Sequence, residues 1–258
     1  MDDHADFLDE RERRIASHQQ NEPLKTVARA FSEESVRARY SYNFEWLGLP
    51  IIQYPQDMQA LQEIIWRTRP DCIVETGVAR GGSLVFYASM LELLGENGVV
   101  VGIDIDIRQH NRKRIVEHPL ARRIRLIDGS SIEPATVDAV RAIVEKHDRT
   151  MVCLDSNHTH EHVLKELEGY APMVSPGCYC VVFDTIIELM PEGFFADRPW
   201  DRGDNPKTAV DAFLRKITEE SAADINGRRL AFECDTSMDR KLMISAARGG
   251  YLRRPHAD

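Results

Sequence analysis

The stretch Ile73-Val-Glu-Thr-Gly-Val-Ala-Arg-Gly-Gly-Ser-Leu84 decides how this chain is organised. It begins as an apolar strand, reaches a carboxylate at Glu75 and passes through three glycines to Ser83. Leu84–Leu94 then has the apolar spacing of a helix. A strand, a glycine-rich turn and a helix in this order are typical of a nucleotide-type binding unit. We expect the glycines to let a ligand approach the backbone and the helix N-terminus to offer N–H groups. A carboxylate here suits a cationic or hydroxylated ligand better than a pyrophosphate.

The composition indicates a globular protein with one large domain. The chain has 258 residues, of which 43% are hydrophobic and 29% charged, and its formal net charge is −9. This acidity argues against a nucleic-acid partner, and no apolar run approaches the ~18 residues that span a membrane. The acidic N-terminus lacks the pattern of a signal peptide. The odd number of cysteines, mostly in strand-like runs, predicts reduced thiols and a cytoplasmic location: Cys72, Cys153, Cys178, Cys180 and Cys234.

The alternation of strand and helix patterns predicts a doubly wound, mostly parallel α/β sheet that ends with antiparallel pairing. The expected strands are Ile73–Glu75, Gly98–Asp106, Ile124–Ile127, Thr150–Leu154, Cys178–Phe183, Arg228–Cys234 and Lys241–Ala246. The expected helices are Gln56–Arg67, Leu84–Leu94, Arg112–His118, Pro134–Lys146, Val163–Tyr170 and Ala209–Thr218. We expect residues 1–50 to form a helical extension, residues 51–248 the main domain and residues 249–258 a frayed basic tail.

Two irregular segments are expected to lie beside the binding site. Tyr42–Pro55 is rich in aromatic residues and contains two prolines, and we interpret it as a loop that packs locally or lines a pocket. Residues 188–208 are rich in Pro, Gly, Asp and Trp and have little periodicity. A loop this long inside a compact domain is usually functional, so we interpret it as a cover over the active site. These two segments are the expected determinants of the substrate.

Acidic residues follow four of the expected parallel strands. Ligands of such sheets bind outside the carboxyl ends of the strands, where Glu75, Asp104, Asp155 and Asp184 all lie. Glu75 and Asp104 belong to the glycine-turn half and would hold the cofactor. Asp155 and Asp184 belong to the substrate half, and hard oxygen ligands on adjacent strand ends suit Mg²⁺. The sequence leaves open whether Asp106 caps a helix.

Two further side chains near these strand ends have alternative interpretations. Ser131 follows the third strand and either caps the next helix or hydrogen-bonds a ligand base. His158 lies three residues after Asp155 and is either a general base beside a metal-bound alcohol or an exposed neighbour of a helix start. The run His158-Thr-His-Glu-His162 also suggests a transition-metal site as an alternative, although it lacks the HExxH spacing.

The same motifs leave rival functions to weigh. A NAD-dependent oxidoreductase would use a similar sheet, but Gly77-Val-Ala-Arg-Gly-Gly82 does not match GxGxxG. An iron-dependent hydroxylase needs two histidines and a carboxylate around one metal, and only His158 is well placed. A non-catalytic relative would keep the fold without the chemistry, and the intact set of Asp155, His158 and Asp184 argues against it.

Five segments together resemble the cephalosporin hydroxylase/rhamnosyl O-methyltransferase family, over roughly residues 40–246. They are Gln53-Tyr-Pro-Gln-Asp57, Val74–Ser83, Val101-Gly-Ile-Asp-Ile-Asp106, Leu154-Asp-Ser-Asn-His-Thr-His160 and Val182-Phe-Asp-Thr185. The resemblance implies a class I S-adenosylmethionine-dependent methyltransferase, with a Rossmann-like, seven-stranded, mostly parallel sheet.

The resemblance also implies residue roles. The cofactor-binding positions are Glu75, Gly77, Gly81, Ser83, Asp104, Asp155 and Ser131, the last near adenine. Asp155 and Asp184 match magnesium ligands of related O-methyltransferases, and His158 matches the general base, with Asp155 as its catalytic partner. Some relatives have Glu-Asp where this chain has Phe183-Asp184. Either Thr185 supplies the third metal ligand or the protein supplies fewer ligands.

The function implied is a Mg²⁺-assisted O-methyltransferase. Its expected acceptor is a hydroxyl of a sugar or other vicinal-oxygen group in a small natural product or glycoconjugate. In such chemistry the protein mainly places an oxygen in line with the methyl group. A bound Mg²⁺ lowers the pKa of the accepting hydroxyl. The charged N-terminal extension also makes a homo-oligomer the expected state.

Overall fold

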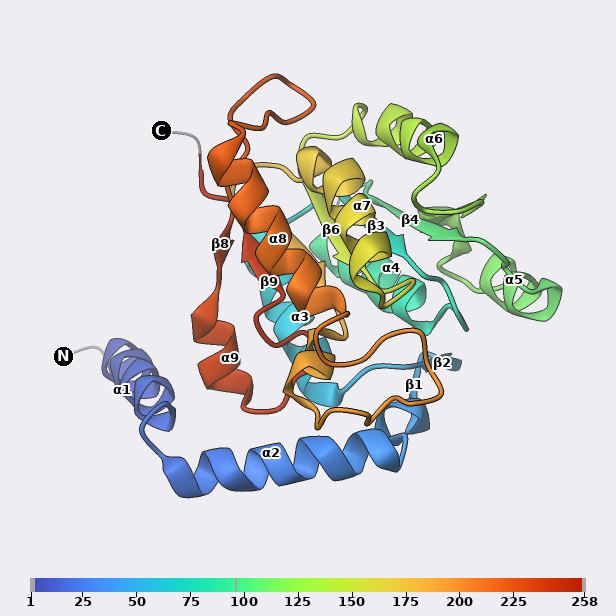
Figure 1. Cartoon of the computed structure of the whole chain (residues 1–258). Coiled ribbons are helices and arrows are strands. Elements are labelled where there is room, and N and C mark those ends of the chain that lie inside the picture. The colour runs from blue at the N-terminus through green and yellow to red at the C-terminus, as the bar shows by residue number, and fades with distance from the viewer. Residues whose placement is uncertain (1–2, 96, 257–258) are drawn as a thin grey trace.

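The computed structural model describes residues 3–95 and 97–256, in which a seven-stranded sheet lies between two layers of helices (Figure 1). The sheet order is β5-β4-β3-β6-β7-β9-β8, and β3 to β7 are parallel. β9 runs antiparallel to both its neighbours. The strands are β3 (Cys72–Thr76), β4 (Val99–Asp104), β5 (Ile124–Asp128), β6 (Thr150–Leu154), β7 (Tyr179–Val182), β8 (Glu233–Cys234) and β9 (Tyr251–Arg253). The prediction of a doubly wound, mostly parallel sheet is confirmed.

Successive residues of the central strands face opposite helical layers. In β3, Ile73 packs with one layer, whereas Cys72 and Val74 pack with the other. Because both faces are covered, all five β3 residues are buried, which explains the near-continuous apolar run. The first layer contains α3 (Pro55–Thr68), α4 (Gly82–Leu94), α5 (Gln109–Val116) and α9 (Thr236–Leu242). The second contains α6 (Pro134–Val144), α7 (His160–Tyr170) and α8 (Pro206–Glu219). Short 3₁₀ turns are η1 (Tyr40–Asn43), η2 (Ala121–Arg123), η3 (Ala171–Met173) and η4 (Thr185–Leu189).

Two helices precede the sheet, as the sequence predicts. α1 (Asp3–His18) has no buried residue and packs against α9. α2 (Glu22–Arg37) begins at Asn21, whose side chain accepts a hydrogen bond from the Leu24 amide. Figure 1 shows both helices at the edge of the molecule, with α2 leading the chain back towards the sheet. Within the described residues, no helix has the length and apolar character needed to cross a membrane.

The expected aromatic loop between Tyr42 and Pro55 is in fact a β-hairpin, so that prediction was wrong. β1 (Phe44–Trp46) pairs antiparallel with β2 (Leu49–Ile51). The two connecting residues, Leu47 and Gly48, have φ of 47° and 89°, as a tight two-residue hairpin turn requires. The usual signal at such a turn is Asn or Gly in the first position, and leucine there conceals it.

The structure predicted for the C-terminal part of the chain was also wrong. Lys241–Ala246 is not a strand, because α9 occupies Thr236–Leu242 and the Asp235 side chain caps its start by accepting from the Ser237 amide. The last strand is β9, which inserts between β7 and β8. The tail predicted to fray from residue 249 therefore contributes to the sheet, and Tyr251 within it is fully buried. The basic residues that suggested a solvated tail are paired: Arg254 forms a buried ion pair with Asp224.

We predict that Arg254→Ala lowers the free energy of unfolding by about 3–5 kcal/mol, because it leaves Asp224 buried without its counter-charge. The neighbouring variant Arg253→Ala is the control, since the ion pair between Arg253 and Glu233 is exposed and such pairs contribute about 0–1 kcal/mol. Urea denaturation followed by circular dichroism measures both. Equal effects of the two substitutions would contradict the structural role assigned to this pair.

Candidate active site

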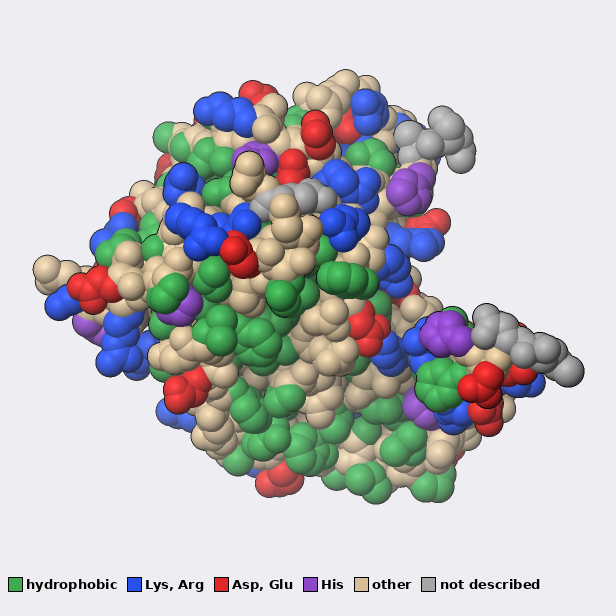
Figure 2. Space-filling view, turned by 180° about the vertical axis from the view of Figure 1, so that it is seen from behind, with side chains coloured by type: hydrophobic (Ala, Val, Ile, Leu, Met, Phe, Trp, Pro, Cys, Tyr) green, Lys and Arg blue, Asp and Glu red, His purple; other side chains and the backbone are tan. Residues whose placement is uncertain are grey.

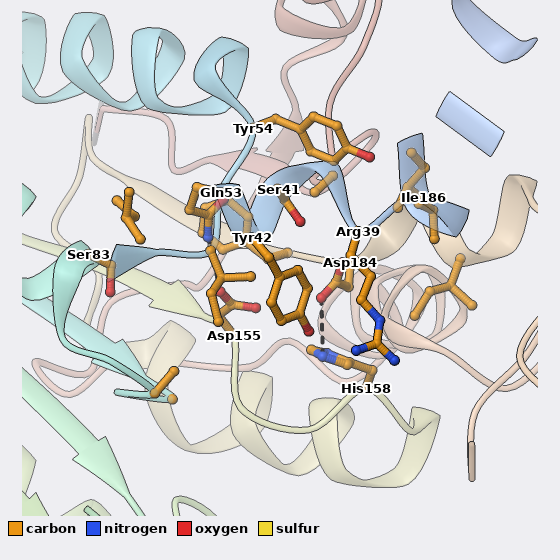
Figure 3. A pocket seen from close by; sticks show the side chains of 18 of the residues that line it. Arg39, Ser41, Tyr42, Gln53, Tyr54, Ser83, Asp155, His158, Asp184 and Ile186 are labelled. Atoms are coloured by element: carbon orange, nitrogen blue, oxygen red, sulfur yellow. Dashed lines mark hydrogen bonds and ion pairs between the residues drawn. The ribbon is translucent and has the colours of Figure 1, made fainter. Parts of the chain in front are cut away.

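A cavity of about 700 Å³ opens at the carboxyl ends of β3, β6 and β7. Its walls come from the glycine turn after β3, from η1 and β2, and from the segment 194–200. Figure 3 shows Ser83 on one side of the cavity, Asp155 near the middle, and Arg39 with His158 on the other side. The volume lies within the ~300–1,000 Å³ typical of small-molecule sites. The segment 188–208 does line the site, as predicted.

Asp155, His158 and Asp184 meet in this cavity. One ligand atom from each lies within 4.8 Å of the others, and this is the one such group found in residues 3–95 and 97–256. His158 Nε2 lies 3.1 Å from Asp184 Oδ2, and the imidazole packs edge-on against Trp200 with ring centroids 4.7 Å apart. Asp184 has φ of 54°, a left-handed conformation that costs a non-glycine residue roughly 1–2 kcal/mol. Strain of this kind tends to occur where a side chain is aimed for function.

The carboxyl group of Asp155 is in a strongly anionic environment. Burial and then the negative charge of Asp184 raise the pKa of Asp155 well above its usual value, and Glu75 adds to this. Gln53 donates from Nε2 to Asp155 Oδ2 at 3.0 Å. The other side-chain atom of this buried glutamine, Oε1, has no hydrogen-bond partner among the described residues. A cation or a hydroxyl-bearing ligand would relieve both the repulsion and the unsatisfied acceptor.

Glu75 lies beneath the glycine turn, not in the cavity wall. It is fully buried and accepts a hydrogen bond from Ser83 Oγ at 2.6 Å. Burial raises the pKa of Glu75 to about 8, and Asp104 adds to the shift, while Ser83 and Tyr87 lower it. Glu75 Oε1 is buried and accepts no hydrogen bond of normal geometry from the described residues. Ser83, by contrast, lines the cavity at the start of α4.

The three glycines of the turn make room for the protein's own chain, and all three also line the cavity. Their expected role in letting a ligand approach the backbone stays a prediction. A Cβ added to Gly77 would lie 2.1 Å from the Asp155 carbonyl oxygen. At Gly81 it would lie 2.4 Å from the Ile115 side chain, and at Gly82 it would lie 2.3 Å from the Pro50 carbonyl oxygen. The turn is glycine-rich because β6, α5 and the hairpin all approach it closely.

Asp104 supports the same turn. Its Oδ2 accepts hydrogen bonds from the amides of Val78 (2.9 Å) and Ala79 (3.3 Å), and its Oδ1 accepts from the Asp106 amide at 3.1 Å. The carboxylate therefore binds the turn that follows β3 to the end of β4. Asp106 is exposed and does not cap the next helix, because α5 has Arg108 in the capping position.

Ser131 and the second and third histidines of the run form contacts elsewhere. Ser131 Oγ lies 3.0 Å from His162 Nε2, and the helix that Ser131 was a candidate to cap begins instead after Glu133. His160 Nδ1 lies 2.8 Å from Thr208 Oγ1. Because His158, His160 and His162 thus diverge, the described residues offer neither a three-histidine site nor the two histidines that an iron-dependent hydroxylase requires.

Thr185 does not join the acidic cluster. Its side chain is buried, and Oγ1 donates to the Ala246 carbonyl oxygen at 3.2 Å. Asp57, which the sequence gave no role, holds the same C-terminal segment by accepting from Ser245 Oγ and the Ala246 amide. Burial raises the pKa of Asp57 to about 6.

Sequence reasoning assigned no role to four side chains that line the cavity: Arg39, Tyr42, Gln53 and Trp200. Three of them precede the sheet, so no strand end marks them. The only signal for Gln53 was its place in a family motif, and Tyr42 and Trp200 were noted as members of aromatic segments.

The sheet order and the acidic site at its carboxyl edge define a class I methyltransferase fold. Residues 38–255 match the model of the rhamnosyl O-methyltransferase/CmcI family, and the chain belongs to that family. It is therefore an S-adenosylmethionine-dependent O-methyltransferase.

Known proteins support this assignment. The rhamnosyl O-methyltransferases of Mycobacterium leprae (strain TN) and Mycobacterium bovis (strain BCG / Pasteur 1173P2) are 25% and 26% identical to it over 215 residues. These alignments cover 81% of this chain and 82% and 77% of the relatives. A CmcI structure with Mg and SAM superposes with a TM-score of 0.55 at 19% identity, covering 83% of this chain and 77% of that one. This likeness shows the shared fold.

The raised pKa of Glu75 predicts how the stability of the ligand-free protein depends on pH. An acid whose pKa is higher in the folded than in the unfolded chain stabilises the fold below its unfolded pKa, and that contribution is lost as pH rises through the folded pKa. We expect the loss between about pH 4.3, the ordinary value for Glu, and about pH 8.

Glu75→Gln is therefore expected to lose less stability than the wild type from pH 5 to pH 8.5, measured by urea denaturation. Asp57 shifts in the same direction in both proteins and cancels. The difference between the two curves therefore reports Glu75 together with its repulsion of Asp155. Parallel curves would contradict the assignment.

Proposed function

We propose that this protein methylates a hydroxyl of a sugar or other vicinal-oxygen group in a small natural product or glycoconjugate, with Mg²⁺ at the acidic cluster. The observation that carries the proposal is the convergence of Asp155, His158 and Asp184 beside Ser83 in one cavity. The family name and the rhamnosyl O-methyltransferase relatives support a sugar hydroxyl as the acceptor.

The glycine-turn side of the cavity fits the methyl donor. Residues Gly81 to Ser83 line it, and α4 begins there without a side-chain cap, so its first N–H groups suit the carboxylate of the donor. The unsatisfied Glu75 Oε1 beneath the turn suits an amino or hydroxyl group. S-adenosylmethionine, when bound, supplies a methyl group on a sulfonium that needs no further activation. Asp104 keeps the turn in place.

The acidic cluster fits Mg²⁺ held by few protein ligands. Asp155 and Asp184 offer carboxylate oxygens, the preceding side chain is the apolar Phe183, and the Thr185 hydroxyl is bonded to Ala246. Mg²⁺ commonly uses one or two carboxylates and completes its shell with waters or substrate oxygens. A bound Mg²⁺ would lower the pKa of a substrate hydroxyl. We therefore propose Asp155 and Asp184 as its protein ligands, without Thr185.

His158 is the proposed general base. If its Nε2 carries the proton that faces Asp184, Nδ1 is the nitrogen that accepts a proton from the acceptor hydroxyl. Asp184 then orients the imidazole and stabilises its charged form. Trp200 packs against the ring and brings the 188–208 segment over it, which favours exclusion of water.

We predict that His158→Ala lowers methyl transfer by 10²–10⁴-fold, the usual contribution of general-base catalysis, with little change in the affinity for S-adenosylhomocysteine. Release of S-adenosylhomocysteine across a panel of glycosides measures the rate, and calorimetry measures the affinity. His110→Ala, on the exposed start of α5, is the control.

The metal is tested with the same assay. EDTA and Asp155→Asn are expected to abolish methyl transfer, and titration with Mg²⁺ alone should show binding to the wild type only. Activity that survives both treatments would remove the metal from the proposal.

We also propose a cytoplasmic homo-oligomer in which the N-terminal helices form an extension beyond the catalytic domain. The cysteines are free, and all but Cys234 are buried, as expected for a reducing compartment. In Figure 2 α1 stands out from the body of the molecule, and hydrophobic side chains gather along the lower edge, where α2 lies in Figure 1. Val27 on α2 is 67% exposed and Phe31 is 40% exposed.

Light scattering of the purified protein is expected to give a mass above that of one chain, and Val27→Asp is expected to reduce it, because a buried charge opposes association. Leu93→Asp, at an equally exposed apolar position outside the extension, is the control. A monomeric wild type would contradict the proposal.

A further inference from the structure

The cavity is lined by more basic than acidic side chains, although the whole chain carries a net charge of −9. Its charged lining consists of Arg37, Arg39, Arg80 and Arg198 against Asp155, Asp184 and Asp197. A divalent cation on the cluster would add to the positive charge. An acidic protein that gathers arginines around its binding site creates a local field that attracts anions.

Arg39 is the most distinctive of these residues. Its backbone has φ of 52°, a left-handed conformation that non-glycine residues seldom adopt. The side chain lines the cavity, yet within residues 3–95 and 97–256 its guanidinium has no hydrogen-bond or ion-pair partner. Figure 3 shows that guanidinium directed to the part of the cavity where His158 and Tyr42 lie, across from Ser83. A strained backbone that presents an unpartnered cation beside the proposed base is a pattern expected at a ligand contact.

Two further arginines line the cavity beside the 188–208 segment. Arg198 lies over the Trp200 ring at 5.7 Å, and Trp200 contacts His158. Arg37 stacks on the Phe194 ring at 4.3 Å, which joins the end of α2 to the 188–208 segment. Each arginine has a long, solvent-exposed ion pair, Arg198 with Asp197 at 4.0 Å and Arg37 with Glu34 at 3.6 Å. Exposed pairs of this kind are weak and leave the guanidinium able to bind a ligand.

We propose that the acceptor carries an anionic group, a carboxylate or a phosphate, and that Arg39 binds it with support from Arg198. This inference rests on the proposed function and narrows its acceptor to an acidic sugar or a sugar phosphate. A guanidinium is the side chain best suited to both anions, because its planar N–H groups pair with two oxygens at once. The anion lies on the side of the cavity away from Ser83, so the hydroxyl to be methylated lies between it and the donor.

The methyl donor has a carboxylate of its own, which is the competing explanation for an arginine in this cavity. Arg80 belongs to the glycine turn, on the donor side, whereas Arg39 lies across from it beside His158. Binding of the acceptor and binding of the donor carboxylate predict different effects of removing Arg39 on ligand affinity. If Arg39 binds the acceptor, the affinity for S-adenosylhomocysteine is unchanged, because this product retains the carboxylate of the donor.

The test is calorimetry on the full chain with saturating S-adenosylhomocysteine and Mg²⁺, using glucuronate, glucose 1-phosphate and glucose as probes. We expect at least one charged probe to bind about tenfold or more tightly than glucose, as a charge-assisted hydrogen bond allows. Which charged probe binds better identifies the anion. Arg39→Ala should remove that preference, Arg39→Lys should restore part of it, and Arg215→Ala, on the exposed face of α8, should have no effect.

Three outcomes overturn the inference: charged probes that bind no better than glucose or not at all, an Arg39→Ala variant that keeps the preference, or an Arg39→Ala variant that instead loses affinity for S-adenosylhomocysteine. Failure of the proposed function has a different signature, because the wild type would then bind none of the three sugar probes, glucose included, whereas failure of this inference alone leaves the binding of glucose intact.

Discussion

The close contact between the ends of β3 and β6 is the constraint on which this active site depends. Gly77 lies against the Asp155 backbone so tightly that a Cβ would be 2.1 Å from its carbonyl oxygen, and the Asp155 amide donates to Thr76 at 2.9 Å. These strands are the two neighbours at which the sheet reverses its order of winding. The glycine turn and the acidic cluster therefore share one cavity although about 80 residues separate them in the chain.

This geometry concentrates negative charge, and the surroundings determine which acids are used. Glu75, Asp155 and Asp184 all lie at the same edge. Burial raises the pKa of Glu75 and of Asp155, and repulsion adds to it, from Asp104 at Glu75 and from Asp184 at Asp155. Glu75 is paired with Ser83 beneath the turn, and Asp104 is occupied by backbone amides. Among the acids at the strand ends, Asp155 and Asp184 present carboxylates to the cavity itself. Repulsion between these two carboxylates does not stabilise the fold. Their closeness is best explained by a ligand that compensates the negative charge.

The parallel core of the fold was predictable because strands buried on both faces leave apolar runs that end in acids. β6 matches its predicted range, and β5 and β7 differ from theirs by one residue or so at an end. The β1–β2 hairpin and β9 were missed because their signals are weak: a leucine occupies the turn, and Arg253 and Arg254 disguise a strand as a tail. At the site, sequence position identified the acids at the strand ends but not their contacts. The periodicity of the sequence does not reveal that Ser131 contacts His162, that Thr185 donates to Ala246, or that a glycine makes room for a neighbouring part of the chain.

The cavity residues to which the sequence analysis assigned no role lie outside the sheet. Arg39 and Tyr42 precede it, Gln53 follows the hairpin, and Trp200 comes from a long connection. Connecting segments of this kind can change without disturbing a buried core. The sheet therefore fixes where the glycine turn and the acidic cluster lie, and in the proposed function the peripheral segments select the acceptor. Because those segments supply arginines and aromatic rings around His158, their chemistry favours a polar, charged acceptor over an apolar one.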